Sequence, residues 1–193
     1  ASPGEQPLDL YLNSNKVNLL PIGYGDGLDY FRAFSGTRIV NIYTHTGQSK
    51  FFSDTVNLKT DSVYSMFFID KATKPGLLLL SDSLTKPAAG KASIRFVNVS
   101  PDAPAVDLAI KDTTTALVSN KAFKGYSPFF PLQANQTYTF EVRRHRQNTV
   151  LATLANVALN DNRVYTIWFH GLAATAIDSD KLKAEIITNV YYN

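Results

Sequence analysis

The sequence SIRFVNVSPDAPAVDLAI at residues 93–110 decides the fold, because its second half is written twice in the chain. The repeated positions lie at a constant offset of 98 with no gap: Ser2, Pro3, Leu8, Asp9 and Leu10 reappear as Ser100, Pro101, Val106, Asp107 and Leu108. A repeat whose period is as long as a domain indicates a tandem duplication. We therefore expect two copies of one domain.

The duplication continues downstream with small changes in loop length. Residues 30–37 align with residues 129–137 after one insertion, and residues 63–65 align with residues 164–166 at an offset of 101. A drift in offset from 98 to 101 adds only a few loop residues. Both copies should therefore share one topology.

A linker is predicted at residues 81–91, SDSLTKPAAGK, which combine a proline with small and charged residues. The predicted domains are then residues 1–85 and residues 91–193. The second copy has an extended stretch, residues 93–99, ahead of its Ser-Pro pair, whereas the first copy starts at that pair. We therefore expect the first domain to lack or borrow its opening strand, and the natural chain to extend upstream.

Apolar and polar residues alternate along most of the chain, which is the period of β-strands. Strand-like runs recur about every ten residues between turn clusters, and residues 30–34 form one such run in the first copy. Hydrophobic residues make up 45% of the chain, enough for each copy to bury a core. The pattern predicts an all-β protein of two tandem β-sandwich domains, immunoglobulin-like or transthyretin-like.

Composition excludes several classes of site and partner. The chain has no cysteine, so disulfides, thiolate nucleophiles and cysteine metal sites are excluded. A net charge of +3, with both signs mixed along the chain, does not indicate nucleic-acid binding. No apolar run is long enough to span a bilayer. No phosphate-binding glycine loop or metal-ligand spacing is present either, and we expect no cofactor.

The Ser-Pro motif predicts a rigid corner between two strands. Pro101 and Pro104 bias the residues before them away from helix, and Ser100 and Asp102 can bond nearby backbone N–H groups. A repeated aspartate could ligate a metal or act in catalysis, but one aspartate in each copy lacks the further oxygen ligands of a hard cation. We therefore interpret it as tying down the corner or covering an edge. The predicted corner residues are Ser2, Pro3, Asp9, Ser100, Pro101, Asp102, Pro104 and Asp107.

A basic cluster near a predicted hairpin tip is the first candidate for a partner surface: Arg143, Arg144, His145 and Arg146. Such a cluster can hold an acidic glycan, a phosphate-rich headgroup or an acidic protein, and it can equally be a solvated edge that resists aggregation. His145 aligns with His45 at an offset of 100, and both are expected to be exposed hairpin residues.

An aromatic cluster is the second candidate: Tyr126, Phe129 and Phe130. Such rings can stack on a sugar or a protein partner, or they can pack inside the domain. Because adjacent residues of a strand face opposite sides, at most one of the two phenylalanines enters the core.

The stretch RFVNVSPDAPAVD at residues 95–107 resembles the hallmark of the domain of unknown function 4397 family. Residues 137–142 and 164–167 look like later strands of that family, and in the first copy GEQP replaces DAPA. The resemblance implies a β-sandwich and an exported address, as in the often lipid-anchored envelope proteins of Bacteroidetes-type bacteria. It implies no established activity and no catalytic residues.

From these observations we predict a non-catalytic binding or structural module of the bacterial cell envelope. It would be periplasmic, anchored to the outer membrane through an upstream lipid, or extracellular, with a glycan or an envelope protein as its partner. The alternatives are a glycan-acting hydrolase and a subunit of a larger surface assembly. A hollow with two carboxylates or a Ser/His/acid cluster would favour the hydrolase, and exposed rings or an exposed charged patch would favour binding.

Overall fold

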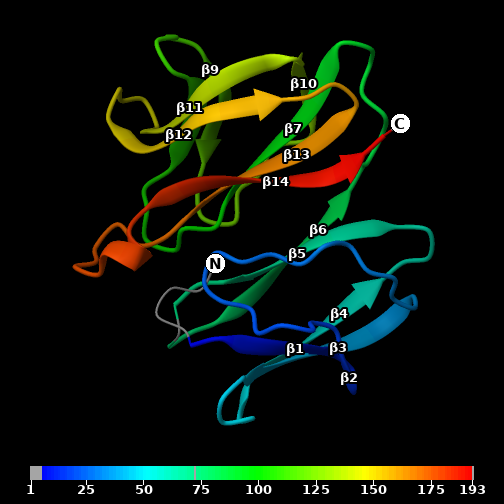
Figure 1. The fold of residues 1–193 in the computed structure, drawn as a ribbon. Coiled ribbons are helices and arrows are strands. Elements are labelled where there is room, and N and C mark those ends of the chain that lie inside the picture. The colour runs from blue at the N-terminus through cyan, green and yellow to red at the C-terminus, as the bar shows by residue number, and fades with distance from the viewer. Residues whose placement is uncertain (1–5, 72, 193) are drawn as a thin grey trace. The chain divides into compact units, whose positions relative to one another are not determined.

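The computed structural model describes residues 6–71 and 73–192, and these residues form an all-β protein (Figure 1). The chain divides into two compact units, unit 1 at residues 1–82 and unit 2 at residues 83–193. Between them, residues 83–90 belong to no strand. The prediction of an all-β, β-sandwich protein is confirmed.

Unit 1 contains six described strands in two sheets. They are β1 (Leu8–Leu12), β2 (Asn15–Lys16), β3 (Gly36–Thr44), β4 (Lys50–Leu58), β5 (Val63–Ile69) and β6 (Gly76–Asp82). The first sheet is antiparallel in the order β2-β1-β3-β4, and the second is the hairpin β5-β6.

Unit 2 contains eight strands in two four-stranded sheets. They are β7 (Lys91–Asn98), β8 (Val106–Ile110), β9 (Ala116–Lys121), β10 (Phe130–Gln133), β11 (Gln136–Arg144), β12 (Val150–Leu159), β13 (Arg163–His170) and β14 (Lys183–Tyr191), with a short 3-10 helix at Asp178–Asp180. The sheet orders are β12-β11-β8-β9 and β10-β7-β13-β14. Among the named strands that the structure describes, only β7 and β13 pair in parallel.

The duplication is visible strand by strand. The sheet β2-β1-β3-β4 of unit 1 has the same order as β9-β8-β11-β12 of unit 2, and the hairpin β5-β6 corresponds to β13-β14. Two strands of unit 2, β7 and β10, have no counterpart among the described residues of unit 1. The strand predicted at residues 30–34 is wrong, because these residues, equivalent to β10, form no strand.

Each unit buries its core between its two sheets. In unit 2 the core includes Phe96 from β7, Leu108 from β8, Phe140 from β11 and Ile167 from β13. In unit 1 five buried residues, Leu8, Leu10, Val40, Ile42 and Val56, all come from the first sheet. Side chains of β5 and β6 pack against them only partly buried.

Strand β13 is buried on both of its faces. Ile167 and Phe169 point into the core, and Trp168 on the opposite face stacks on His170 with ring centroids 4.0 Å apart. Burial lowers the pKa of His170 to about 3, and the nearby Lys183 charge adds to this shift. His170 is therefore a neutral packing residue at physiological pH.

Replacing Phe140 by alanine is expected to lower the free energy of unfolding by about 3–5 kcal/mol, because it opens a cavity in a fully buried site. Urea denaturation followed by circular dichroism measures this change. The matched control is Phe34→Ala, whose side chain is 87% exposed, and it should change stability by less than about 0.5 kcal/mol. Equal effects of the two variants would contradict the assignment of the core.

Candidate functional site

An aspartate and a histidine join the hairpin tip of unit 2 to the strand that follows its corner. The backbone N–H of His145 donates to the carbonyl of Ala105 at 2.9 Å, and its Nδ1 lies 2.9 Å from Asp107 Oδ1. The same oxygen accepts the N–H of Asn120 at 2.6 Å and the hydroxyl of Ser119 at 2.9 Å. One carboxylate oxygen therefore links β8, β9 and the β11–β12 hairpin.

Unit 1 repeats this arrangement with Asp9 and His45. The backbone N–H of His45 donates to the carbonyl of Pro7 at 2.9 Å, and its Nδ1 lies 3.1 Å from Asp9 Oδ1. We call the two pairs, Asp9 with His45 and Asp107 with His145, the Asp–His clasps. In both units the histidine backbone bonds to the residue two positions before the aspartate, while the imidazole bonds to the aspartate itself.

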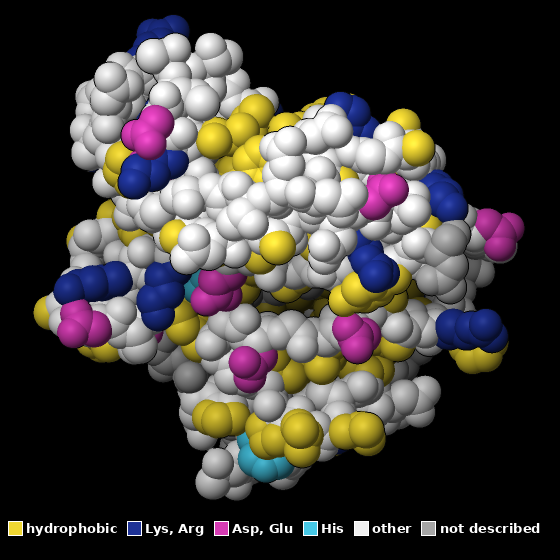
Figure 2. All heavy atoms as spheres, turned by 45° about the horizontal axis from the view of Figure 1, so that its top comes forward, with side chains coloured by type: hydrophobic (Ala, Val, Ile, Leu, Met, Phe, Trp, Pro, Cys, Tyr) yellow, Lys and Arg dark blue, Asp and Glu magenta, His cyan; other side chains and the backbone are white. Residues whose placement is uncertain are grey.

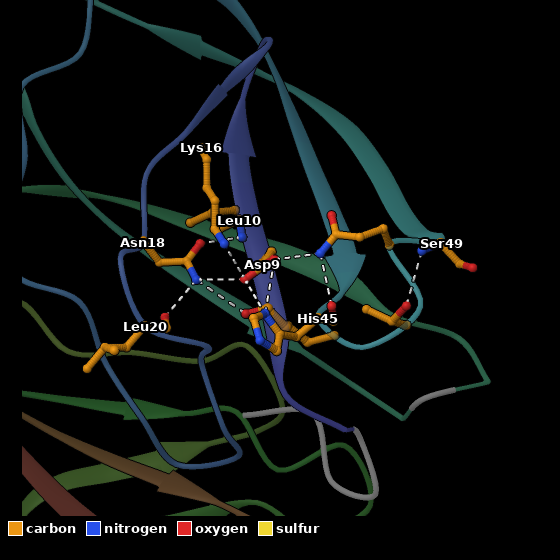
Figure 3. A network of polar contacts seen from close by, with 10 residues as sticks. Asp9, Leu10, Lys16, Asn18, Leu20, His45 and Ser49 are labelled. Atoms are coloured by element: carbon orange, nitrogen blue, oxygen red, sulfur yellow. Dashed lines mark hydrogen bonds and ion pairs between the residues drawn. The ribbon is translucent and has the colours of Figure 1, made fainter.

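The Asp9 carboxylate is fully buried within a larger polar network (Figure 3). Besides the histidine it contacts Lys16 Nζ at 2.9 Å, Gln48 Nε2 at 3.1 Å and Asn18 Nδ2 at 3.2 Å. The amide of Asn18 also accepts the Leu10 N–H at 2.7 Å through its oxygen. Asp9 alternates with the core residues Leu8 and Leu10 along β1, so it lies on the opposite face of the strand. It is nevertheless buried, because these polar side chains cover it.

Both clasp carboxylates are held in the ionised form. Burial alone would raise the pKa of Asp9, but contacts with Lys16, Gln48, His45 and Asn18 outweigh it and hold that pKa well below its ordinary value. For Asp107 burial is likewise outweighed, chiefly by the Asn120 N–H and by His145, so its pKa is also lowered. Such shifts favour folding at neutral pH.

The geometry at Ser119 differs from that of a Ser-His-Asp hydrolase. In a triad the imidazole bonds to the acid through one nitrogen and to the serine through the other. Here Ser119 Oγ lies 3.4 Å from His145 Nδ1, the nitrogen that faces Asp107, and the hydroxyl donates to Asp107. The serine is therefore a further support for the carboxylate.

Neither clasp forms part of a recognisable metal centre. Within residues 6–71 and 73–192 no group of three or more His, Asp or Glu side chains converges as a metal ion would need. The partners of Asp9 are amide and ammonium nitrogens together with one imidazole. Such donors stabilise a carboxylate and do not complete an oxygen shell for a hard cation.

The Ser-Pro corner of unit 2 is held by partners that are distant in sequence. Ser100 Oγ donates to the carbonyl of Gly171 at 2.7 Å, and Asp102 Oδ1 accepts the N–H of Ala173 at 2.8 Å. Ser100 thus bonds a backbone carbonyl and not the expected N–H group, whereas Asp102 accepts a backbone N–H from a residue distant in sequence. Pro101 and Pro104 lie half-buried in the same corner. Ser2 and Pro3 of the first copy lie outside the described residues.

Only glycine fits at position 171. Its φ is +97°, and a Cβ there would lie 2.3 Å from the carbonyl oxygen of Lys181. This close approach lets the chain turn directly after β13 and present the Gly171 carbonyl to Ser100.

The basic cluster splits into two environments. Arg143 is mostly buried: its Nε and Nη2 bond to Glu141 Oε2 at 2.9 and 2.7 Å, and its Nη1 donates to the Thr113 carbonyl at 2.7 Å. Arg144 and Arg146 are exposed, and neither side chain forms a hydrogen bond or an ion pair within the described part of the chain. These two arginines are the cations that the tip offers to a partner.

The three aromatic candidates also separate. Phe130 packs against the core, whereas Phe129 lies under the guanidinium of Arg95 with 4.6 Å to the ring centroid. Tyr126 is 49% exposed. Of the three rings, Tyr126 is the one most available to a ligand.

Charge is mixed over the face shown in Figure 2, where basic and acidic side chains are interspersed among uncharged and apolar ones. This agrees with the small net charge of +3. Electrostatic attraction of a partner would therefore depend on local groups such as the hairpin tip.

The hollows lined by described residues of unit 2 include a larger and a smaller one. The larger, of about 410 Å³, is lined by β12, β13 and β14 and the loop before β13, without any acidic or histidine side chain. The smaller, of about 220 Å³, contains Asp112 and Glu141. Glu141 is bonded there to Arg143, which also holds the Thr113 carbonyl in the β8–β9 turn. The Glu141 carboxylate in the smaller hollow therefore has a structural role, because it holds Arg143 in place.

Sequence reasoning found the members of each clasp but did not join them. Asp9 and Asp107 were aligned at an offset of 98, and His45 and His145 at an offset of 100. An acid and a base that recur together at aligned positions are a signal for a repeated contact. Lys16, Asn18, Gln48 and Ser119 gave no comparable signal, because they do not recur in both copies.

Replacing Asp9 by asparagine is expected to destabilise the protein by about 1–3 kcal/mol at pH 7, since charge-assisted hydrogen bonds are lost in a buried site. The folded pKa is depressed, so the wild-type advantage is complete above the unfolded value near 3.9 and declines as pH falls below it. Denaturation of both proteins from pH 7 to pH 3 measures this difference.

The control for Asp9→Asn is Asp29→Asn at an exposed carboxylate. Its stability difference from wild type should stay within about 0.5 kcal/mol across the same pH range. A wild-type advantage over Asp9→Asn that grows on acidification would refute the ionised clasp.

No helix in the described residues is long and apolar enough to cross a membrane.

Comparison with known proteins assigns the family. No curated protein matches the chain. The model of the family described as a domain of unknown function, DUF4397, matches residues 1–109. The match covers more than half of the chain and ends within β8, just past Asp107. It agrees with the hallmark at residues 95–107, and the protein therefore belongs to the DUF4397 family.

Proposed function

We propose that this protein is a non-catalytic binding module of the bacterial cell envelope, and that it engages an anionic partner through the hairpin tip of unit 2. The observation that carries the proposal is the exposure of Arg144 and Arg146 on one tip without intramolecular partners in the described part of the chain. The family resemblance supports the proposed exported address. An anionic envelope glycan is the partner that fits both the exposed arginines and an exported address.

Arginine suits such a partner because its planar guanidinium binds carboxylate, sulfate and phosphate groups in a bidentate manner. Two arginines separated by one residue can contact successive charges of a polymer. Individual contacts at an exposed site are weak, so repetition along a glycan chain would supply the affinity.

The clasp supports the proposal because it fixes the tip. His145 lies between the two arginines, and both its backbone and its imidazole are bonded to the neighbouring strand region. A tip held at two points loses less conformational freedom on binding than a free loop would. Tyr126 offers an exposed ring that could stack on a sugar.

Binding would be asymmetric between the copies. The tip of unit 1 carries Thr44 and Thr46 at the positions of the two arginines, while His45 and its clasp are retained. The duplication therefore kept the support of the tip and changed the groups beside it. We propose the partner site for unit 2 alone.

The rival proposal, a glycan-acting hydrolase, is favoured by one observation, the presence of Asp112 and Glu141 in one hollow. Two carboxylates facing one space are the minimum for glycoside hydrolysis. Release of reducing ends from envelope glycan by the wild type, and its loss in Asp112→Asn, would favour this rival. Absence of reducing ends under conditions of saturable binding favours the binding module.

The double variant Arg144→Ser/Arg146→Ser is expected to bind an anionic polysaccharide such as polygalacturonate at least tenfold more weakly than the parent in low salt. Wild-type affinity should fall as salt rises toward physiological strength, where charges are screened over about 8 Å. Titration calorimetry at two salt concentrations measures both effects. The matched control is Lys59→Ser/Lys74→Ser, which removes two exposed charges from unit 1. Equal binding by the two double variants would overturn the proposal.

Arg143 should respond differently from its neighbours. Arg143→Ser is expected to lower the free energy of unfolding by about 1.5–3 kcal/mol, because it leaves Glu141 and the Thr113 carbonyl without their partner. The Arg144→Ser/Arg146→Ser variant should stay within about 0.5 kcal/mol of the parent. Denaturation curves of both variants separate the structural arginine from the two exposed ones.

A further inference from the structure

Unit 2 shows what its β7 strand contributes to the fold. β7 lies between β10 and β13, pairing antiparallel with β10 and parallel with β13. Its residues Ala92, Ile94 and Phe96 point into the core and are fully buried. One strand thus supplies two backbone ladders and three core side chains.

In unit 1 no described residue forms a strand at the corresponding place. β5, the counterpart of β13, pairs with β6, and no described strand pairs with its other edge (Figure 1). Residues 28–34, the counterpart of the β10 region, form no strand either. An edge of this kind presents backbone groups on which another strand can be templated.

Burial differs between the copies at the positions that β7 covers. Ile167 and Phe169 of β13 are fully buried, whereas their equivalents Met66 and Phe68 on β5 are only half-buried. Phe130 packs against the core of unit 2, while its equivalent Phe31 is 47% exposed. The apolar surface left uncovered in unit 1 is therefore the surface that a β7-like strand would bury.

We propose that the β5 edge and residues 28–34 of unit 1 form an acceptor site for one extended polypeptide strand with the apolar alternation of β7, entering parallel to β5. The repeat specifies the direction, because β7 runs parallel to β13 from Ser93 opposite Val164 to Asn98 opposite Phe169. Two copies of the chain related by a twofold axis perpendicular to the sheet would pair their β5 edges antiparallel. The parallel direction of β7 therefore indicates a separate donor strand and not the β5 edge of a second copy.

The outer face adds a requirement for the donor sequence. In unit 2, Arg95 of β7 donates to Thr166 Oγ1 at 3.0 Å. In unit 1 the equivalent of Thr166 is Ser65, whose Oγ lies 3.1 Å from the hydroxyl of Tyr30 and donates to Asp82 Oδ2 at 2.6 Å. Because Ser65 already has these partners, a small residue is sufficient where β7 has Arg95, and this site is independent of the hairpin tip of unit 2.

A synthetic peptide with the sequence of residues 91–100 and the change Arg95→Ser is the probe. Added to the full chain, it is expected to bind saturably and to slow amide hydrogen exchange of residues 63–69 and 28–34 at least tenfold, because both segments gain ladder bonds. Hydrogen exchange read by mass spectrometry gives the location and the size of the change.

Two controls test the chemistry of the site. A peptide that also carries Ile94→Asp and Phe96→Asp keeps the length but lacks the apolar face, and it should not protect β5. The acceptor variant Phe31→Ser/Phe34→Ser, changed at exposed rings of residues 28–34, should fold as the parent does and lose at least tenfold in peptide affinity.

A tethered form of the donor strand tests the same acceptor site without added peptide. Fusing the same donor strand ahead of residue 1 is expected to protect residues 63–69 without added peptide and to abolish binding of the free peptide. Unchanged exchange of residues 63–69 in both the saturated and the tethered forms would overturn the proposal. Protection that appears in unit 2 instead, through exchange with β7, would overturn it as well.

Discussion

The clasped carboxylate is the interaction on which the corner and hairpin of each unit depend. A buried charge is costly unless several donors surround it, and Asp9 is fully buried only because Lys16, Gln48, His45 and Asn18 converge on it. Those donors come from separate strands and loops. Ionisation of one side chain therefore requires the strand after the corner and the hairpin tip to come together.

The clasp also explains how a domain can keep its fold while its surface changes. In each unit the histidine is the point where the tip is attached, and its neighbours point elsewhere. Unit 1 has Thr44 and Thr46 beside His45, whereas unit 2 has Arg144 and Arg146 beside His145. Thr44 is buried and accepts the Ser49 N–H, whereas Arg144 is exposed, so the residues beside the histidine differ between the copies while both clasps are kept.

The duplication and the alternation of apolar residues were sufficient to predict an all-β pair of sandwich domains, and the hallmark was sufficient to predict the family. The role of Ser100 could not be predicted, because its partner is the backbone carbonyl of Gly171 and backbone groups have no sequence signature. Arg143 could not be separated from Arg144, because alternation does not say which strand face holds Glu141. Residues 30–34 were predicted as a strand from their pattern, but a strand also needs a neighbour with which to pair.

A comparison of the two copies shows how a neighbouring strand affects burial. Met66 and Phe68 are as apolar as Ile167 and Phe169, so their lower burial does not arise from side-chain chemistry. Strand β13 has β7 as a neighbour, whereas β5 has no described strand at the corresponding edge. The difference in burial follows from this difference in strand pairing. Uncovered apolar surface accordingly gathers in unit 1, whereas the exposed pair Arg144 and Arg146 lies in unit 2. The two copies of one sandwich therefore differ in surface chemistry: apolar side chains are exposed in unit 1, and a pair of exposed arginines lies at the hairpin tip of unit 2.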